Sequence, residues 1–280
     1  MDAMAVLTIV VVASLVLAGT VLATDNPAGP PAGKPARLVT LRFWGHACFT
    51  LTADGRTVLI DPFSPKVGYK PFDVEPDLVL ISHEHFDHND TSWLKGKPLV
   101  LHGLDDQGQV QQIDRRVGPF RVRTVAAQHW SDPANQQRGN NAIFVIEVSG
   151  LRIVHAGDLG RTLDARQVQA IGPVDVLLVP VGGFFTIDAD QAYAAAQELQ
   201  PRAYVVPMHY RTAALDESLR SRLAEPTPFL RKFGENTLRP EGNELTIDPA
   251  NLPAERQAVL MNYRPAAPVP PNSTMPAGKP

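Results

Sequence analysis

A short apolar strand followed at once by a histidine-rich motif constrains this chain more than any other feature. Leu78–Ile81 has the continuous apolar pattern of a buried strand, and His83-Glu84-His85-Phe86-Asp87-His88 follows it. In an extended segment His83 and His85 face the same side, with Asp87 and His88 within reach of the same cavity. The alternative is a solvated turn, but three imidazoles and a carboxylate so close together are costly to bury without a purpose. The motif therefore predicts a metal site at the end of this strand.

Three later residues extend the motif, because each lies where a predicted strand meets a loop. They are His129, Asp158 and His209. Taken singly, each has an ordinary structural interpretation. Strand ends hold side chains rigidly, so together with the first motif these residues are expected to converge on one rim. The three strands are predicted at Val122–Val125, Arg152–His155 and Ala203–Val206.

The first half of the chain is rich in strand patterns. Leu38–Phe43, Cys48–Leu51 and Thr57–Ile60 are short apolar or alternating runs divided by turn residues, which predicts an antiparallel meander. Cys48 lies within an apolar run, so we expect it in the core. Further strands are predicted at Leu99–Leu101, Ala142–Val148 and Val174–Val179.

Helical patterns alternate with strands in the second half. Asp188–Leu199 is the clearest helix, because Asp188 and Gln191 have the spacing of a capping box. Leu215–Phe233 also has a helical pattern, which Pro226 and Pro228 interrupt. The order of elements predicts an α/β fold in which two packed sheets carry helices on the outside, a four-layer arrangement.

Both ends of the chain are expected to lie outside the folded domain, which we place at residues 36–263. Residues 1–23 include an uncharged apolar run and predict a signal peptide or an N-terminal anchor, with a buried helix as the alternative. The protein is therefore expected to be exported, periplasmic or secreted, and held at the membrane by residues 5–23 if they are not cleaved. The composition predicts that residues 24–35 form a Pro/Gly-rich linker and that residues 264–280 form a disordered Pro-rich tail.

Composition excludes several classes of protein and partner. A hydrophobic content of 44% excludes disorder throughout the chain. The 26 basic and 29 acidic residues argue against a nucleic-acid partner held by bulk charge. Cys48 is the only cysteine, so the chain has no internal disulfide and no thiolate metal cage. A small-molecule substrate is the expected partner, and the oligomeric state is left open.

The segment from His83 to His88 matches the H-x-H-x-D-H signature of the metallo-β-lactamase superfamily, which this chain resembles. Other segments are similar to the lactonase-like branch, which includes ascorbate-6-phosphate lactonase, uncharacterised metal-dependent hydrolases and N-acyl-phosphatidylethanolamine phospholipase D. The likeness spans about Leu41 to Thr212 and implies an αββα sandwich with metals between the loop edges of its sheets. The similar segments are Trp44–Ala47, Ala127–Trp130, His155–Asp158, Pro180–Gly183 and Pro207–Tyr210.

The resemblance also implies a set of ligands for two divalent metal ions. One ion takes His83, His85 and His129, the other takes Asp87, His88 and His209, and Asp158 bridges them. Ligands of this type favour zinc, with manganese or iron as alternatives. The implied reaction is hydrolysis of an ester, lactone or phosphodiester bond by a hydroxide that the two metals share. The alternatives are an iron-dependent redox member of the same fold and a non-catalytic metal-binding envelope protein.

The remaining candidates surround this centre. Asp87 is expected to orient the hydroxide as well as to bind metal. His46 is a candidate proton donor at the pocket edge, with a structural histidine as the alternative. Gly182, Gly183 and Tyr210 are candidate substrate-binding residues, the glycines because they allow close backbone approach. His155 is expected to orient the loop that carries Asp158.

Overall fold

The structure is a computed structural model that describes residues 37–70, 72–129 and 139–264. The predicted signal peptide or anchor (1–23), the predicted linker (24–35), Trp130 and the predicted tail beyond Arg264 lie outside these ranges. Within the described ranges, no helix combines the length and the apolar character needed to cross a membrane.

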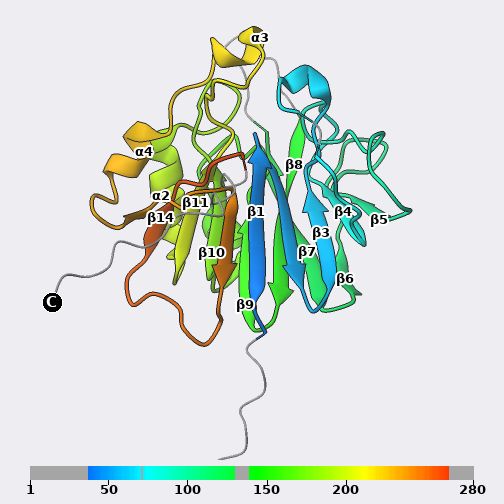
Figure 1. Cartoon of the computed structure of the whole chain (residues 1–280), viewed down its shortest axis with the longest axis horizontal. Coiled ribbons are helices and arrows are strands. Elements are labelled where there is room, and N and C mark those ends of the chain that lie inside the picture. The colour runs from blue at the N-terminus through cyan, green and yellow to red at the C-terminus, as the bar shows by residue number, and fades with distance from the viewer. Residues whose placement is uncertain (1–36, 71, 130–138, 265–280) are drawn as a thin grey trace, which may run out of the picture. The chain divides into compact units, whose positions relative to one another are not determined.

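Two mixed β-sheets form the centre of the described domain (Figure 1). The first has six strands in the order β13-β1-β2-β3-β4-β5, and the second has eight in the order β12-β14-β11-β10-β9-β8-β7-β6. The strands of the first sheet are β1 (Val39–Gly45), β2 (Cys48–Ala53), β3 (Arg56–Ile60), β4 (Leu78–Ile81), β5 (Leu99–His102) and β13 (Glu244–Ile247). Those of the second are β6 (Asp114–Val117), β7 (Phe120–Gln128), β8 (Asn140–Val148), β9 (Leu151–His155), β10 (Val176–Pro180), β11 (Tyr204–Met208), β12 (Thr237–Leu238) and β14 (Gln257–Val259).

Strand pairing confirms the predicted opening meander. β1, β2 and β3 pair antiparallel in chain order, and β4 and β5 then continue the sheet in parallel. The other neighbour of β1 comes from the far end of the chain, since Val39 lies opposite Ile247 of β13. In the second sheet β9, β10 and β11 run parallel, so their carboxyl ends meet at one edge.

The six-stranded sheet is apolar on both faces. In β3, Val58 and Ile60 belong to the core cluster shared with the eight-stranded sheet, and Leu59 points to the opposite face, as the period of a strand requires. Leu59 packs there with Val67, which lies in the short 3-10 helix η1 (Pro65–Val67), and with Cys48. Cys48 is therefore a buried core residue, as predicted.

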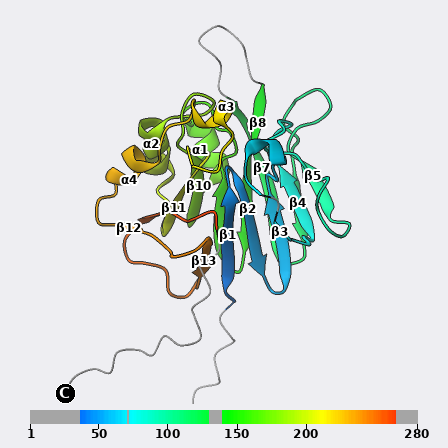
Figure 2. The same cartoon turned by 45° about the horizontal axis from the view of Figure 1, so that its top comes forward.

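The α-helices α1 (Ala165–Ile171), α2 (Ala189–Leu199) and α4 (Thr227–Arg231) accompany the eight-stranded sheet (Figure 2). The α2 helix packs on β10 and α4, and α1 packs against β7. With the two sheets, this arrangement confirms the predicted α/β sandwich fold.

Local signals in the sequence explain where the helices begin. The side chain of Asp188 accepts the N–H of Gln191, whose side chain accepts the N–H of Asp188, so the predicted capping box is present. The stretch 215–233 forms two short helices, α3 (Glu217–Arg220) and α4. Pro226 is the N-cap of α4 and Pro228 lies in its first turn, where proline is tolerated, so these prolines start a helix.

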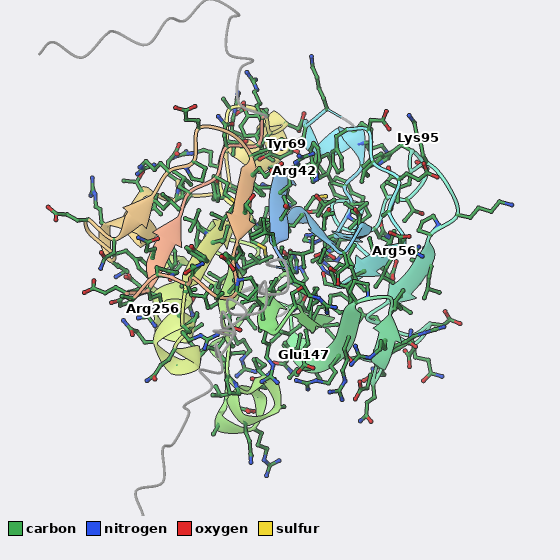
Figure 3. All side chains as sticks on the ribbon, turned by 60° about the horizontal axis from the view of Figure 1, so that its bottom comes forward. Arg42, Arg56, Tyr69, Lys95, Glu147 and Arg256 are labelled. Carbon is green, nitrogen blue, oxygen red and sulfur yellow. The ribbon has the colours of Figure 1, made fainter. Side chains whose placement is uncertain are left out.

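Long charged side chains lie around the outside of the sheets, and the labelled Arg56, Lys95 and Arg256 illustrate this (Figure 3). Lys95 pairs with Asp73 at 2.7 Å, both well exposed. Buried polar groups gather instead beside the strand ends near α3, where the histidine motif lies.

Candidate metal centre

The histidine motif follows β4 as a tight turn. β4 ends at Ile81, and the N–H of His88 donates to the carbonyl of His85 at 2.9 Å. This turn brings the imidazoles together, because Nε2 of His83 lies 3.1 Å from Nδ1 of His85. His83 and His88 are buried, and Phe86 at the tip of the turn is 49% exposed.

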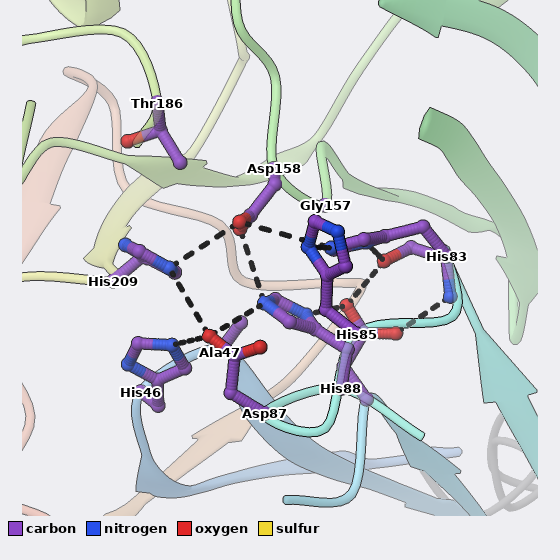
Figure 4. A network of polar contacts seen from close by, with 12 residues as sticks. His46, Ala47, His83, His85, Asp87, His88, Gly157, Asp158, Thr186 and His209 are labelled. Atoms are coloured by element: carbon purple, nitrogen blue, oxygen red, sulfur yellow. Dashed lines mark hydrogen bonds and ion pairs between the residues drawn. The ribbon is translucent and has the colours of Figure 1, made fainter. Parts of the chain in front are cut away.

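Potential ligand atoms form three overlapping groups, and within each group they lie no more than 4.8 Å apart (Figure 4). Every residue predicted as a metal ligand belongs to one of these groups, and His46 joins them. The groups are His83, His85 and His129; His83, His88 and Asp158; and His46, Asp87, His88 and His209.

The Asp158 carboxylate lies at the centre of the arrangement. Its Oδ2 is 3.1 Å from Nε2 of His129 and 3.4 Å from Nε2 of His209, and its Oδ1 is 3.2 Å from Nε2 of His88. It therefore reaches residues of all three groups, as a bridging carboxylate must. At 2% exposure it is shielded from water.

Several buried atoms of the site fit a cation. Nε2 of His88, Nε2 of His209 and Oδ1 of Asp158 have no hydrogen-bond partner among the described residues. Buried polar atoms without partners carry a desolvation cost, and a metal ion would remove that cost here. Imidazole nitrogens and carboxylate oxygens suit zinc, manganese or iron.

The pKa shifts favour protonation states that bind metal. Burial, with the nearby His88, lowers the pKa of His83 well below its ordinary value. Burial alone raises the pKa of Asp158, but His209 and His88 outweigh it and lower that pKa well below the ordinary value. Neutral imidazoles and ionised carboxylates are the forms that coordinate metals.

His88 is the exception, because its pKa is raised. Burial lowers its pKa, but Asp158, Asp87 and Asp61 together raise it well above the ordinary value. The three carboxylates therefore make this point of the site favourable for a positive charge.

Asp61 is a member of the site that sequence reasoning missed. It is fully buried directly after β3, and it accepts hydrogen bonds from the N–H of Ser82 (2.7 Å), the hydroxyl of Ser82 (2.7 Å) and Nδ1 of His88 (2.8 Å). The last bond fixes the ring so that Nε2 faces Asp158, the arrangement by which a second carboxylate orients a metal-binding histidine.

Hydrogen bonds with His155 and Asn141 also fix the loop that carries Asp158. His155 Nδ1 accepts the N–H of Gly157 at 3.1 Å, as predicted. Asn141, which the sequence did not single out, accepts the N–H of Asp158 at 2.9 Å and donates to the carbonyl of Ala156 at 2.8 Å.

The sequence offered His46 as a proton donor at the pocket edge or as a structural histidine, and the structure places it in contact with Asp87 but not among the residues that line the adjoining cavity. Its Nε2 is 2.9 Å from Oδ2 of Asp87, and the ring is 1% exposed. Burial, together with the neighbouring His209, lowers its pKa to about 4. A neutral His46 donates from Nε2 to the Asp87 carboxylate and holds it in place.

An adjoining cavity of about 310 Å³ reaches Asp87 and Asp158. This volume is at the small end of the range for ligand pockets. The lining residues are His85, Phe86, Asp87, Asp158, Phe185, Ser218, Leu219 and Arg222.

The three candidate substrate-binding residues are not among those that line this cavity. A Cβ on the buried Gly182 would lie 2.1 Å from the carbonyl oxygen of His209, so this glycine permits close packing of two strand ends. Gly183 has a positive φ of 64° and turns the chain. Tyr210 is 6% exposed in the core, and its hydroxyl points to the carbonyl of Met261.

Comparison with known proteins agrees with this geometry. A family model described as the beta-lactamase superfamily domain matches residues 40–209. A UPF0173 metal-dependent hydrolase of Thermococcus onnurineus is 34% identical over 194 residues, which cover 62% of this chain and 86% of the relative. A relative of the same name from Thermoplasma acidophilum is 36% identical over 185 residues, covering 60% and 81% of the two chains.

Solved structures give the same picture. A Thermotoga maritima protein, assigned to the zinc-dependent hydrolases of the metallo-beta-lactamase superfamily, has a TM-score of 0.63 and 32% identity, and the match covers 80% of this chain and 98% of that one. Igni18, a metallo hydrolase from Ignicoccus hospitalis, has a TM-score of 0.50 and 27% identity, covering 70% and 90%.

Proposed function

The chain belongs to the beta-lactamase superfamily and is a metal-dependent hydrolase, and from this premise we propose that it uses two divalent metal ions to cleave an ester, lactone or phosphodiester bond. Zinc is the proposed metal, in preference to manganese or iron. Export, a small-molecule substrate and the absence of a nucleic-acid partner belong to the same proposal.

One observation carries the proposal, namely that the ligand groups are joined by a single carboxylate. His83, His85 and His129 form one group, and Asp87, His88 and His209 lie in another. Asp158 contacts His129 of the first group and both His88 and His209 of the second. Two cations with a shared bridging ligand fit this pattern better than one.

Each residue then has a distinct task. The His and Asp ligands would hold two divalent ions, which would lower the pKa of a water molecule to about 7 and polarise the carbonyl or phosphoryl oxygen under attack. Asp87 lines the cavity, so its carboxylate is placed to orient the attacking water. His46 acts as a positioning residue, because it contacts Asp87 and is not among the residues that line the cavity. Asp61 in turn holds His88 in its orientation.

Metal stoichiometry and turnover of the purified chain test the proposal together. We expect about two zinc or manganese ions per chain by mass spectrometry, and hydrolysis within a panel of esters, lactones and phosphodiesters. Asp158→Ala should abolish turnover and lower the metal content, while the circular dichroism spectrum stays that of a folded protein.

Other results would point elsewhere. A single iron per chain would favour the redox alternative, and no metal after reconstitution at neutral pH would favour a binding protein. An active Asp158→Ala variant would contradict the role given to the bridging carboxylate.

A further inference from the structure

Arg222 lines the same cavity as Asp87, and no acidic residue among those described forms an ion pair with its guanidinium. In the described part of the chain its guanidinium makes no ion pair and no side-chain hydrogen bond, and it lies 5.4 Å from the ring centre of Phe184. Arg220, two residues earlier, pairs instead with Glu217. A guanidinium held over an aromatic ring at a cavity, without a carboxylate partner, is well placed to bind an anion.

Part of the lining of this cavity is apolar. Phe86 lines it, and Phe86 and Phe184 are 49% and 50% exposed. Phe185 and Leu219 line it as well. Exposed aromatic side chains grouped beside a pocket are typical of a ligand-binding surface.

The backbone of Phe184 is strained, which supports a functional role for this residue beside Arg222. Its φ is +56°, in the left-handed region that a bulky residue rarely adopts, and it follows Gly183 at +64°. The N–H of Phe185 donates to the carbonyl of Gly183 at 2.6 Å and closes this turn. The fold keeps an unfavourable conformation that leaves Phe184 against Arg222, and such strain is common at functional sites.

We propose that the substrate is an amphipathic anion, with the scissile bond at Asp87 and Asp158, an apolar chain against Phe86, and a carboxylate or phosphate at its far end on Arg222. This inference rests on the proposed function for the position of the scissile bond. A sphere of 310 Å³ is ~8 Å across, which corresponds to roughly six methylene groups between the scissile carbonyl and the anion.

Two pairs of probes test the proposal on the metal-loaded chain. The first pair is the para-nitrophenyl half-ester of suberic acid and its neutral methyl ester, compared by kcat and KM. The second pair contains no ester bond. It consists of suberic acid monoanilide and the matching compound with a terminal primary amide, and their binding is compared by titration calorimetry. The variants are Arg222→Gln and, as a matched control, Arg220→Gln.

In the wild type we expect the anionic member of each pair to bind about tenfold better, with the kinetic difference in KM. Arg222→Gln should remove most of this preference, and Arg220→Gln should keep it. An equal preference in Arg222→Gln would overturn the proposal, because the anion would then lie on the metals. No binding of either anilide to the wild type would overturn it as well.

The two readouts separate this inference from the hydrolase proposal. If neither ester is cleaved but the anilide preference depends on Arg222, the inference stands, while cleavage of an ester bond is contradicted. If both esters are cleaved with no effect of Arg222 on either pair, the hydrolase proposal stands and the inference fails.

Discussion

Replacing Asp61 with asparagine isolates the contribution of a buried carboxylate that touches no substrate. Asp61 accepts three hydrogen bonds, two from Ser82 and one from His88. In Asp61→Asn only one side-chain oxygen remains, so the new amide group must face at least one of these donors. The shape is conserved, and the change is confined to hydrogen bonding and charge.

The cost follows from the contacts. Losing one charge-assisted hydrogen bond costs about 1.5–3 kcal/mol, and leaving a buried donor without an acceptor costs about 1–3 kcal/mol more. We therefore expect Asp61→Asn to lower the free energy of unfolding by roughly 3–5 kcal/mol. Nδ1 of His88 then either faces the new amide group or keeps only an uncharged acceptor, so its ring is held less firmly and the affinity for metal should fall about 10- to 100-fold.

Equilibrium dialysis against buffered zinc, with metal content read by mass spectrometry, measures the affinity, and urea unfolding of the metal-free chain measures the stability. Asp54→Asn is the matched control, because Asp54 is exposed and its φ of 48° equals that of Asp61 (47°) within a degree. Both substitutions suit a left-handed backbone equally. If Asp61→Asn bound two metals as tightly as the wild type, the orienting role of Asp61 would be refuted.

Two further substitutions test the hydrogen bonds of Asp77 and the close packing at Gly182. Burial raises the pKa of Asp77, but the N–H of Thr57 and the Arg56 guanidinium outweigh it and lower that pKa. The stabilisation is thus present above about pH 4 and lost as the pH falls through the folded pKa, so Asp77→Asn should cost about 1 kcal/mol at pH 7 by urea unfolding and almost nothing near pH 2. An equal cost at both pH values would contradict this account. Gly182→Ala should destabilise the chain by about 1–3 kcal/mol in the same assay and reduce bound metal, since its Cβ would meet the His209 carbonyl. An unchanged metal content would show that the end of β11 adapts to the extra methyl group.

Sequence reasoning was most successful where one local signal suffices. The apolar run of β4 and the histidine motif after it could be recognised together, and the capping box of α2 was visible as Asp188 and Gln191. The same signal precedes α1, where Asp164 and Gln167 form an identical capping box, yet that helix was not predicted. Only Ile171 of its seven residues is buried, so α1 lacks the buried apolar stripe that marks α2.

What the sequence did not reveal depends on contacts between distant segments. Asp61 stands alone before Pro62, with no second ligand nearby, so its role appears only when β3 and β4 pair. Tyr210 directly follows the predicted ligand His209 and was a candidate substrate contact, but it packs near Phe43 and is buried in the core. The pairing of β1 with β13 has no local signal at all.

That last pairing has a consequence for how the chain is made. Glu244 of β13 follows its partner Arg42 of β1 by 202 residues. At about 5–20 residues per second, translation leaves β1 as an open edge for roughly 10–40 s, with its backbone groups free to pair with another nascent chain. Synthesis that stops before β13 therefore leaves β1 as an unpaired edge strand, and in the full sheet the four-residue strand β13 takes that edge position.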